Sequence, residues 1–299
     1  MHENTVTSLD RRNFLKVAGA AAGAASLAEG RAALPAPIAT SNLIDVNVNL
    51  ARWPLRRVAG DETAALVAKL QSHGVVQAWA GSFDGVLHKD IASANVRLVD
   101  ECRQHGQSLL VPFGSINPKL PDWEEELRRC AEIHHMPGIR LHPSYHGYKL
   151  DDPDFARLLR LAAERGLLVQ LAVLMEDRRM MHPLLQVEPP DLKPLTPLVK
   201  QVPGLRLVLL NSSTMLRDQS LVDLIDAGEI CVEIAMLDGI GGVGNLLRKV
   251  PLDRILFGSY APLFYFESAL LKLKESPLSD EQLRVIGHEN ARRLLARNR

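Results

Sequence analysis

Short apolar runs recur along the chain from residue 43 onwards. The first, Leu43–Leu50, reads LIDVNVNL and places two polar residues, Asn47 and Asn49, on one face near its end. Seven more runs follow, and a segment of helical character separates most of them. We interpret the runs as eight strands: Leu43–Leu50, Val75–Ser82, Ser108–Asn117, Gly138–His142, Leu167–Leu174, Leu205–Asn211, Ile230–Met236 and Arg254–Ser259.

Helices are predicted between and after these strands. They cover Glu62–His73, Asn95–His105, Asp122–His134, Pro153–Arg165, a segment near Leu195–Gln201, and Asp280–Ala296. Strands that alternate with helices indicate a parallel sheet, and eight such units indicate a closed ring. The pattern therefore predicts an α/β protein with one domain, a (β/α)8 TIM-type barrel over residues 40–299.

The first 39 residues are predicted to lie outside this barrel. Arg11–Lys16, with Ser8 upstream, resembles the twin-arginine export signal. The Ala/Gly-rich run from Val17 to Leu27 is too short and too weakly apolar for a stable membrane span, but it suits the apolar part of such a signal. Small residues from Ala32 to Ala39 offer cleavage sites. We expect a periplasmic or otherwise exported protein with no stable span after signal removal; the alternative is a cytoplasmic N-terminal helix and linker.

Composition narrows the classes of partner. The 35 Lys and Arg residues balance 35 Asp and Glu residues, and aromatic residues make up 5% of the chain. This balance argues against a nucleic-acid partner and against a polybasic membrane patch. Cys102, Cys130 and Cys231 lack the spacing of a metal site, so we expect buried structural thiols.

Four segments in order resemble the amidohydrolase-related branch of the amidohydrolase superfamily. They are Ile44-Asp45, Gly138–Pro143, Arg254–Ser259 followed by Pro262, and Gly287–Leu294, and the resemblance extends from Leu43 to about Leu295. Members of that branch include metal-dependent hydrolases, lactonases and nonoxidative decarboxylases that act on small carboxylated molecules. The resemblance thus implies a small-molecule substrate and, as an expectation from the family, a homodimer.

The family's metal ligands are not matched in this chain. Where the family has a His-x-His pair on the first strand, this sequence has Asn47 and Asn49. Ligand histidines usually end the fifth and sixth strands, where Gln170 and Asn211 are nearest, and Tyr260 replaces the aspartate after the eighth. Amides are poor zinc ligands, and a phenol with a pKa near 10 is no carboxylate base. We therefore predict that no metal and no other cofactor takes part.

The chemistry of such a barrel lies at the carboxyl ends of its strands. The first hypothesis is a metal-independent hydrolase or lyase, in which Glu176 or Asp177 forms an acid/base pair with His142 or His182. This pair requires a carboxylate within hydrogen-bond reach of a histidine inside the barrel mouth. An arginine is expected to bind the substrate's carboxylate, the candidates being Arg52, Arg140 and Arg178.

The other polar residues at the strand ends are expected to contact the substrate. These are Asn47, Asn49, Tyr145, His146, Asn211 and Tyr260, although a purely structural role is an equal alternative for both asparagines of the first strand and for Tyr260. Two further hypotheses stay open. One is a relocated metal site formed by His142, His146, Glu176 and His182; the other is a noncatalytic exported protein that binds a small molecule.

Overall fold

The structure is a computed structural model that describes residues 42–106 and 108–296. The predicted export signal and linker lie outside the described residues. Within the described part of the chain, no helix combines the length and apolar character needed to cross a membrane.

Eight parallel strands form one sheet in the order of the chain. They are β1 (Leu43–Leu50), β2 (Val75–Ser82), β3 (Leu110–Ser115), β4 (Gly138–Leu141), β5 (Leu168–Ala172), β6 (Arg206–Leu210), β7 (Glu229–Glu233) and β8 (Ile255–Leu256). Backbone N–H groups of Val46 and Asn49 donate to the carbonyls of Phe257 and Ala261, at 3.0 and 2.9 Å. These bonds join β1 to the segment that directly follows β8, so the predicted barrel is confirmed.

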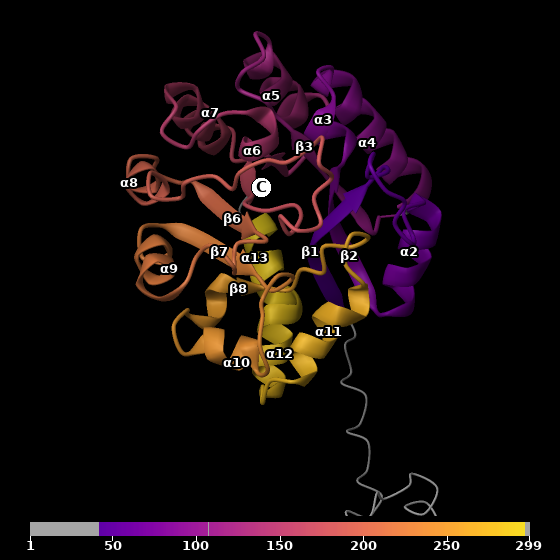
Figure 1. Cartoon of the computed structure of the whole chain (residues 1–299), viewed down its shortest axis with the longest axis vertical. Coiled ribbons are helices and arrows are strands. Elements are labelled where there is room, and N and C mark those ends of the chain that lie inside the picture. Colours follow the sequence, from indigo (N-terminus) through magenta and orange to yellow (C-terminus); the bar gives the residue numbers. More distant parts are fainter. Residues whose placement is uncertain (1–41, 107, 297–299) are drawn as a thin grey trace, which may run out of the picture. The chain divides into compact units, whose positions relative to one another are not determined.

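Helices surround the ring of strands (Figure 1). They are α2 (Thr63–Ser72), α3 (Asp84–Leu87), α4 (Ile91–His105), α5 (Trp123–Glu132), α6 (Pro143–His146), α7 (Pro153–Glu164), α8 (Leu195–Lys200), α9 (Asp218–Ile225), α10 (Gly242–Leu247), η1 (Leu252–Arg254), α11 (Phe266–Lys274), α12 (Asp280–Arg284), η2 (Val285–Glu289) and α13 (Asn290–Ala296). The predicted helix over residues 95–105 in fact begins at Ile91, because the side chain of Asp90 accepts the N–H of Ser93 and caps it. The predicted last helix is interrupted by the π-helical segment η2.

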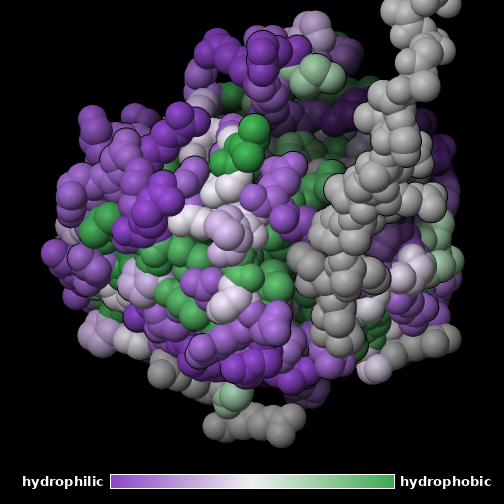
Figure 2. All heavy atoms as spheres, turned by 90° about the horizontal axis from the view of Figure 1, so that it is seen from below, coloured by the Kyte–Doolittle hydropathy of each residue, from purple (hydrophilic) through white to green (hydrophobic). Residues whose placement is uncertain are grey.

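The interior of the barrel is layered. At the amino-terminal end of the strands, Trp79 and Phe113 stack with ring centroids 5.1 Å apart and form an apolar floor with Leu168, Val208 and Leu256. Between this floor and the carboxyl ends of the strands lies a layer of buried polar side chains, described below. A larger apolar core lies between the barrel and its helices. On the face shown in Figure 2, hydrophobic areas are interspersed with hydrophilic residues, as is usual for the surface of a folded domain.

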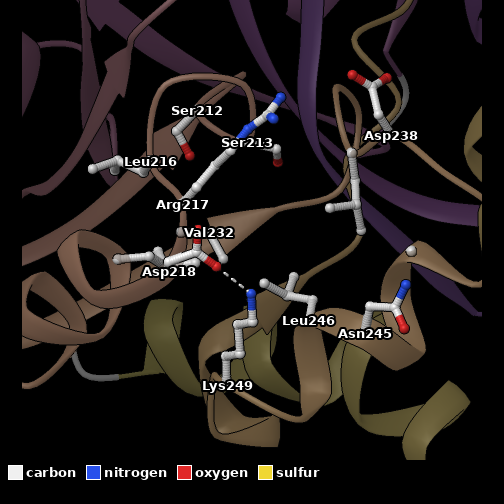
Figure 3. A pocket seen from close by; sticks show the side chains of 13 residues that line it. Ser212, Ser213, Leu216, Arg217, Asp218, Val232, Asp238, Asn245, Leu246 and Lys249 are labelled. Carbon is white, nitrogen blue, oxygen red and sulfur yellow. Dashed lines mark hydrogen bonds and ion pairs between the residues drawn. The ribbon is translucent and has the colours of Figure 1, made fainter.

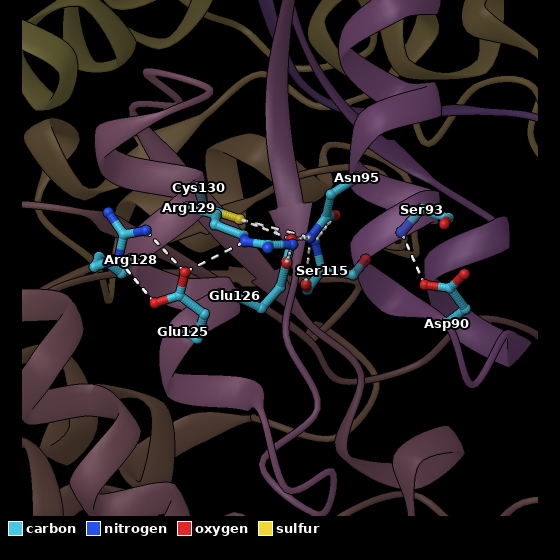
Figure 4. Close-up of polar contacts among 9 residues, drawn as sticks. All are labelled: Asp90, Ser93, Asn95, Ser115, Glu125, Glu126, Arg128, Arg129 and Cys130. Carbon is cyan, nitrogen blue, oxygen red and sulfur yellow. Dashed lines mark hydrogen bonds and ion pairs between the residues drawn. The ribbon is translucent and has the colours of Figure 1, made fainter.

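A separate polar network lies outside the barrel, between α4, β3 and α5 (Figure 4). The amide nitrogen of Asn95 donates to the carbonyl of Ser115 at 2.9 Å and to Oε1 of Glu126 at 2.7 Å, and its oxygen accepts the N–H of Ser115 at 2.7 Å. Burial raises the pKa of Glu126. The three cysteines are free and buried, as predicted.

Candidate active site at the barrel mouth

The two asparagines of β1 lie in the barrel interior and are almost completely buried. The amide nitrogen of Asn47 donates to Oδ1 of Asn211 at 2.9 Å and lies 3.4 Å from Oε1 of Glu233. The oxygen of Asn49 instead accepts a hydrogen bond from Arg140 at 2.9 Å. One polar atom of each side chain is therefore bound to another protein group, as in the structural role that the sequence left open, while Oδ1 of Asn47 and Nδ2 of Asn49 are buried without a partner among the described residues; contact with a substrate stays a prediction.

Glu233, at the end of β7, is the central acceptor on one side of this layer. It is completely buried and accepts the backbone N–H of Asn211 at 2.6 Å and that of Ala235 at 2.5 Å. Burial raises its pKa to about 7, although the hydrogen bonds oppose the shift. Burial likewise raises the pKa of Asp45, on β1, to about 6. The pKa values of both carboxyl groups thus lie close to neutral pH, where a side chain can act as an acid or a base.

Arg140, on β4, is the central donor on the other side. Its Nε donates to Oε1 of Gln170 at 2.8 Å, and its Nη2 donates to the carbonyl of Trp79 at 2.9 Å. Its Nη1 donates to the carbonyl of Val48 at 2.8 Å as well as to Asn49. Burial lowers its pKa to about 10, so the guanidinium remains charged at neutral pH. These bonds engage each nitrogen with the protein itself, so the predicted binding of a substrate carboxylate by Arg140 has little geometric support.

Three buried aromatic side chains, which we call the roof, cover this polar layer; they are Trp53, Phe83 and Tyr260. Trp53 and Phe83 are 2% exposed and pack edge to face with centroids 5.2 Å apart. Tyr260 is completely buried, and its hydroxyl donates to the carbonyl of Met175 at 2.6 Å. Tyr260 is therefore a packed aromatic, as one of the two interpretations of the sequence had it, but its hydroxyl makes an internal hydrogen bond and does not reach solvent.

The predicted carboxylate–histidine pair is not assembled among the described residues. Glu176 is buried, but its Oε1 pairs with Arg56, 3.1 Å from Nε and 3.0 Å from Nη2. Asp177 is exposed and pairs with Arg179 at 2.7 Å, an ion pair that lowers the pKa of Asp177 to about 2. His182 is also exposed, and its Nδ1 accepts a backbone N–H at 3.2 Å. The geometry thus removes the support for Asp177 and His182 as a base and its partner.

The remaining two predicted arginines lie on the surface of the mouth. Arg52 is exposed and pairs with Glu62, and Arg178 is exposed and pairs with Glu188 at 2.9 Å. The relocated metal site is not formed either. In the ranges 42–106 and 108–296, no three or more side chains of His, Cys, Asp or Glu are grouped so as to hold a metal ion. The residues present therefore do not fit the metal that the family resemblance implies.

The turn from β4 into α6 gathers several polar atoms that are buried without a partner among the described residues. His142 is 1% exposed, and neither ring nitrogen has a hydrogen-bond partner among the described residues. The hydroxyl of Tyr145 and Nδ1 of His146 are likewise buried and unpartnered. The two imidazoles pack at 76° with centroids 5.7 Å apart. Burial lowers the pKa of both histidines, so both are neutral at pH 7.

One tautomer of His146 is selected by its surroundings. Its Nε2 lies 2.9 Å from the carbonyl oxygen of Gly85, at α3. A carbonyl only accepts, so we assign the proton to Nε2, which leaves a lone pair on Nδ1; backbone hydrogen bonding to Gly85 and Ile116 opposes the fall in the pKa of this ring. His146 therefore presents a neutral, oriented base atom inside the mouth, next to His142 and Tyr145.

A cavity of about 350 Å³ opens beside the mouth, between α9 and α10 (Figure 3). Ser212, Ser213 and Arg217 line one side, and Lys249 reaches across to Asp218 at 2.5 Å. Its walls come from the segments after β6 and β7, so it lies apart from the turn between β4 and α6.

A family model described as amidohydrolase matches residues 50–297. The chain belongs to this amidohydrolase family. No curated protein sequence matches the chain.

Solved structures with the same fold include several decarboxylases. The 2,6-dihydroxybenzoate decarboxylase from Rhizobium superposes with a TM-score of 0.68 at 14% identity, over 86% of this chain and 99% of that chain. The 5-carboxyvanillate decarboxylase from Sphingomonas paucimobilis gives 0.67 at 12% identity, over 85% and 99%. A dihydroxybenzoic acid decarboxylase from Polaromonas, solved with bound manganese, gives 0.66 at 15%, over 87% and 98%. At these identities the likeness shows the fold alone.

Sequence reasoning assigned no role to two residues that organise the site of this family member. Glu233 ends the apolar run of β7, and a lone carboxylate at such a position is a signal that could have drawn attention to it. Gly85 acts through its backbone carbonyl, so no side-chain pattern could have revealed its contact with His146. His142, Tyr145 and His146 were predicted as site residues, and the structure brings these three together.

Proposed function

We propose that this protein is a hydrolase or lyase that acts on a small carboxylate-bearing molecule and uses neutral imidazoles instead of a metal. The observation that carries the proposal is the buried, unpartnered Nδ1 of His146, whose tautomer is set by Gly85. Membership of the amidohydrolase family supports a small-molecule reaction, and the decarboxylases of the same fold suggest the carboxylate.

In the proposed reaction, Nδ1 of His146 acts as the general base. It takes a proton from an attacking water or from a substrate hydroxyl and returns it to the group that leaves or to the carbon that loses its carboxylate. His142 and the hydroxyl of Tyr145 supply further hydrogen bonds to the bound molecule, because their own polar atoms have no other partner among the described residues. The imidazoles must be neutral for this role, and burial keeps them so.

A substrate has to pass the roof to reach these groups. The ion pair between Arg56 and Glu176 links the loop after β1 to the loop after β5 above Tyr145 and Trp53. We propose that these two loops separate when the substrate enters. Exclusion of water after closure would then strengthen the hydrogen bonds within the site.

The test compares His146→Ala with Asp177→Asn in the full chain. Chelator-treated protein is incubated with a panel of aromatic and aliphatic carboxylic acids and lactones, and turnover is followed by proton NMR. We expect turnover of at least one compound by the wild type, loss of it in His146→Ala, and retention in Asp177→Asn. Turnover that survives in His146→Ala contradicts the proposed base.

The second candidate is a noncatalytic binding protein. The observation that favours it is that neither ring nitrogen of His142 has a partner among the described residues, so no carboxylate orients this imidazole as a base. It predicts that a carboxylate from the same panel binds in isothermal titration calorimetry, while no compound is converted. Conversion of any compound that His146→Ala abolishes would exclude this candidate.

We also propose that the protein is exported by the twin-arginine route, because Arg11–Lys16 matches that signal. Replacing Arg11 and Arg12 with lysine is expected to leave the protein in the cytoplasmic fraction of the host cell. Unchanged distribution between cytoplasmic and periplasmic fractions would contradict this.

A further inference from the structure

The positions where the family resemblance leads one to expect metal ligands are already occupied by internal hydrogen bonds. The oxygens of Asn49 and Gln170 both accept from Arg140, and the oxygen of Asn211 accepts from Asn47. Tyr260 turns its hydroxyl to the carbonyl of Met175. A metal ion would have to break these bonds to reach the oxygens of Asn49, Gln170 and Asn211, whereas Oδ1 of Asn47 has no partner among the described residues.

The chain makes room for the Arg140 side chain by a glycine on the neighbouring β2 strand. A Cβ atom at Gly81 would lie 2.7 Å from Nη1 and 2.8 Å from Cδ of Arg140, closer than such atoms approach. The guanidinium connects β4, which carries it, with acceptors on β1, β2 and β5. It is the central cross-link on its side of the polar layer.

The same arrangement holds for the opposite charge. A Cβ atom at Gly258 would lie 2.6 Å from Oε2 of Glu233, so this glycine makes room for the carboxyl group. Glu233 connects β7 with Asn47 on β1 and with the N–H of Asn211 after β6. Arg140 and Glu233, each packed against a glycine, thus join β1, β2, β4, β5, β7 and the segment after β6.

We infer that the Arg140 guanidinium is the resident cation of this barrel and that, together with Glu233, it holds the strand ends in the way that a bound metal would. Its fixed positive charge at the centre of the polar layer also opposes the binding of a second cation there. This inference concerns the built-in cation and stands apart from the proposed base, His146.

The experiment restores two ligands with and without Arg140. Three full-length proteins are compared: wild type, Asn47→His/Asn49→His, and the same double variant with Arg140→Met. Each is stripped with chelator and titrated with Co²⁺, and binding is followed by visible absorption. Two imidazoles and the adjacent Glu233 would then offer three ligands. Zinc content after dialysis is measured by plasma mass spectrometry.

We expect no cobalt band in the wild type, weak or no binding in the double variant, and an affinity at least about tenfold tighter once Arg140 is also replaced. Equal cobalt affinity with and without Arg140 overturns the inference, as does near-stoichiometric zinc in the wild type. If the Arg140→Met protein does not fold, Arg140→Lys in the double variant keeps the charge and is expected to bind cobalt no more tightly than the double variant does. Tighter cobalt binding by that variant also overturns the inference. Because every readout is metal binding, the result does not depend on whether His146 is catalytic.

Discussion

Around Arg140 and Glu233, most polar side chains inside the barrel bind one another, whereas at the turn from β4 into α6 a cluster of buried polar atoms lacks a partner among the described residues. Asn49 and Gln170 both accept from Arg140, and Glu233 accepts from two backbone N–H groups. By contrast, His142 has two buried ring nitrogens without a partner. Both regions are buried, so burial alone does not separate them.

Whether buried polar atoms have hydrogen-bond partners distinguishes a structural network from a candidate binding site. A buried polar group normally has a hydrogen-bond partner, and leaving it without one costs free energy. A satisfied network therefore stabilises the fold, as the Asn95–Glu126 network does outside the barrel. An unsatisfied cluster at the mouth of a barrel is where a ligand or ordered water supplies the missing partners. The first four predictions below each perturb one of the two regions, and the last perturbs the exposed loop after β5.

The largest effect on stability is expected from Arg140→Met. It removes one member of a buried charged network and leaves the acceptors on Asn49 and Gln170 unpaired, so we expect a loss of roughly 3–5 kcal/mol in the free energy of unfolding. Urea denaturation measures it. The matched control is Arg128→Met on the exposed face of α5, where we expect a loss below about 1 kcal/mol. Similar losses in the two variants would remove the distinction between the networks.

His146→Ala tests the unsatisfied region. We expect a fall in turnover of about 10²- to 10⁴-fold, the usual contribution of a general base, with the free energy of unfolding changed by less than about 1 kcal/mol. Kinetics and urea denaturation of the same sample give both quantities. A large loss of stability with turnover unchanged would place His146 with the structural network instead.

The variant Glu233→Gln tests whether the buried carboxyl group of Glu233 is protonated in the folded protein, through the pH dependence of stability. The pKa of Glu233 is raised from 4.5 to about 7 in the folded protein, so folding favours its protonated form. Its contribution to stability is complete below pH 4.5 and is lost as pH rises through about 7, an effect on the order of 3 kcal/mol. We expect this decline to be smaller in Glu233→Gln than in the wild type, as measured by urea denaturation at pH 4.5 and pH 8. Identical declines would show that Glu233 is ionised in the folded protein at pH 4.5.

The variant His142→Asn is expected to change the pH dependence of stability on the acidic side instead. The pKa of His142 is lowered on folding, so the unfolded chain takes up the proton first and the wild type loses stability as pH falls below about 6.5. The variant should lose less stability between pH 7 and pH 5, measured by thermal denaturation. Equal losses would indicate that the imidazole is charged when buried.

The smallest effect is expected from the exposed loop after β5. Asp177→Asn and His182→Ala remove side chains that lie on the surface, so turnover should change by less than about twofold and stability by less than about 0.5 kcal/mol. A tenfold loss of turnover in either variant would return these residues to the site.

Some of the site could be predicted from the sequence because strand ends in a barrel all lie at one face. That rule identified His142, Tyr145 and His146 without any coordinates. The same rule also selected Asp177 and His182, because sequence spacing does not reveal whether a loop turns inward or lies in solvent. The long loop after β5 placed both of these side chains on the surface.

The sequence by itself determined the barrel, because eight apolar runs alternating with amphipathic helices have few other ways to bury their apolar faces. It also determined that the residues at the expected metal positions are amides and a phenol. Only the tertiary structure decided which polar atoms are satisfied. Arg140 meets Asn49 across 91 positions of the chain, and His146 meets the carbonyl of Gly85 across 61. Such pairings depend on how distant strands and loops pack together, and hydrogen bonds that link distant segments leave no local pattern in the sequence.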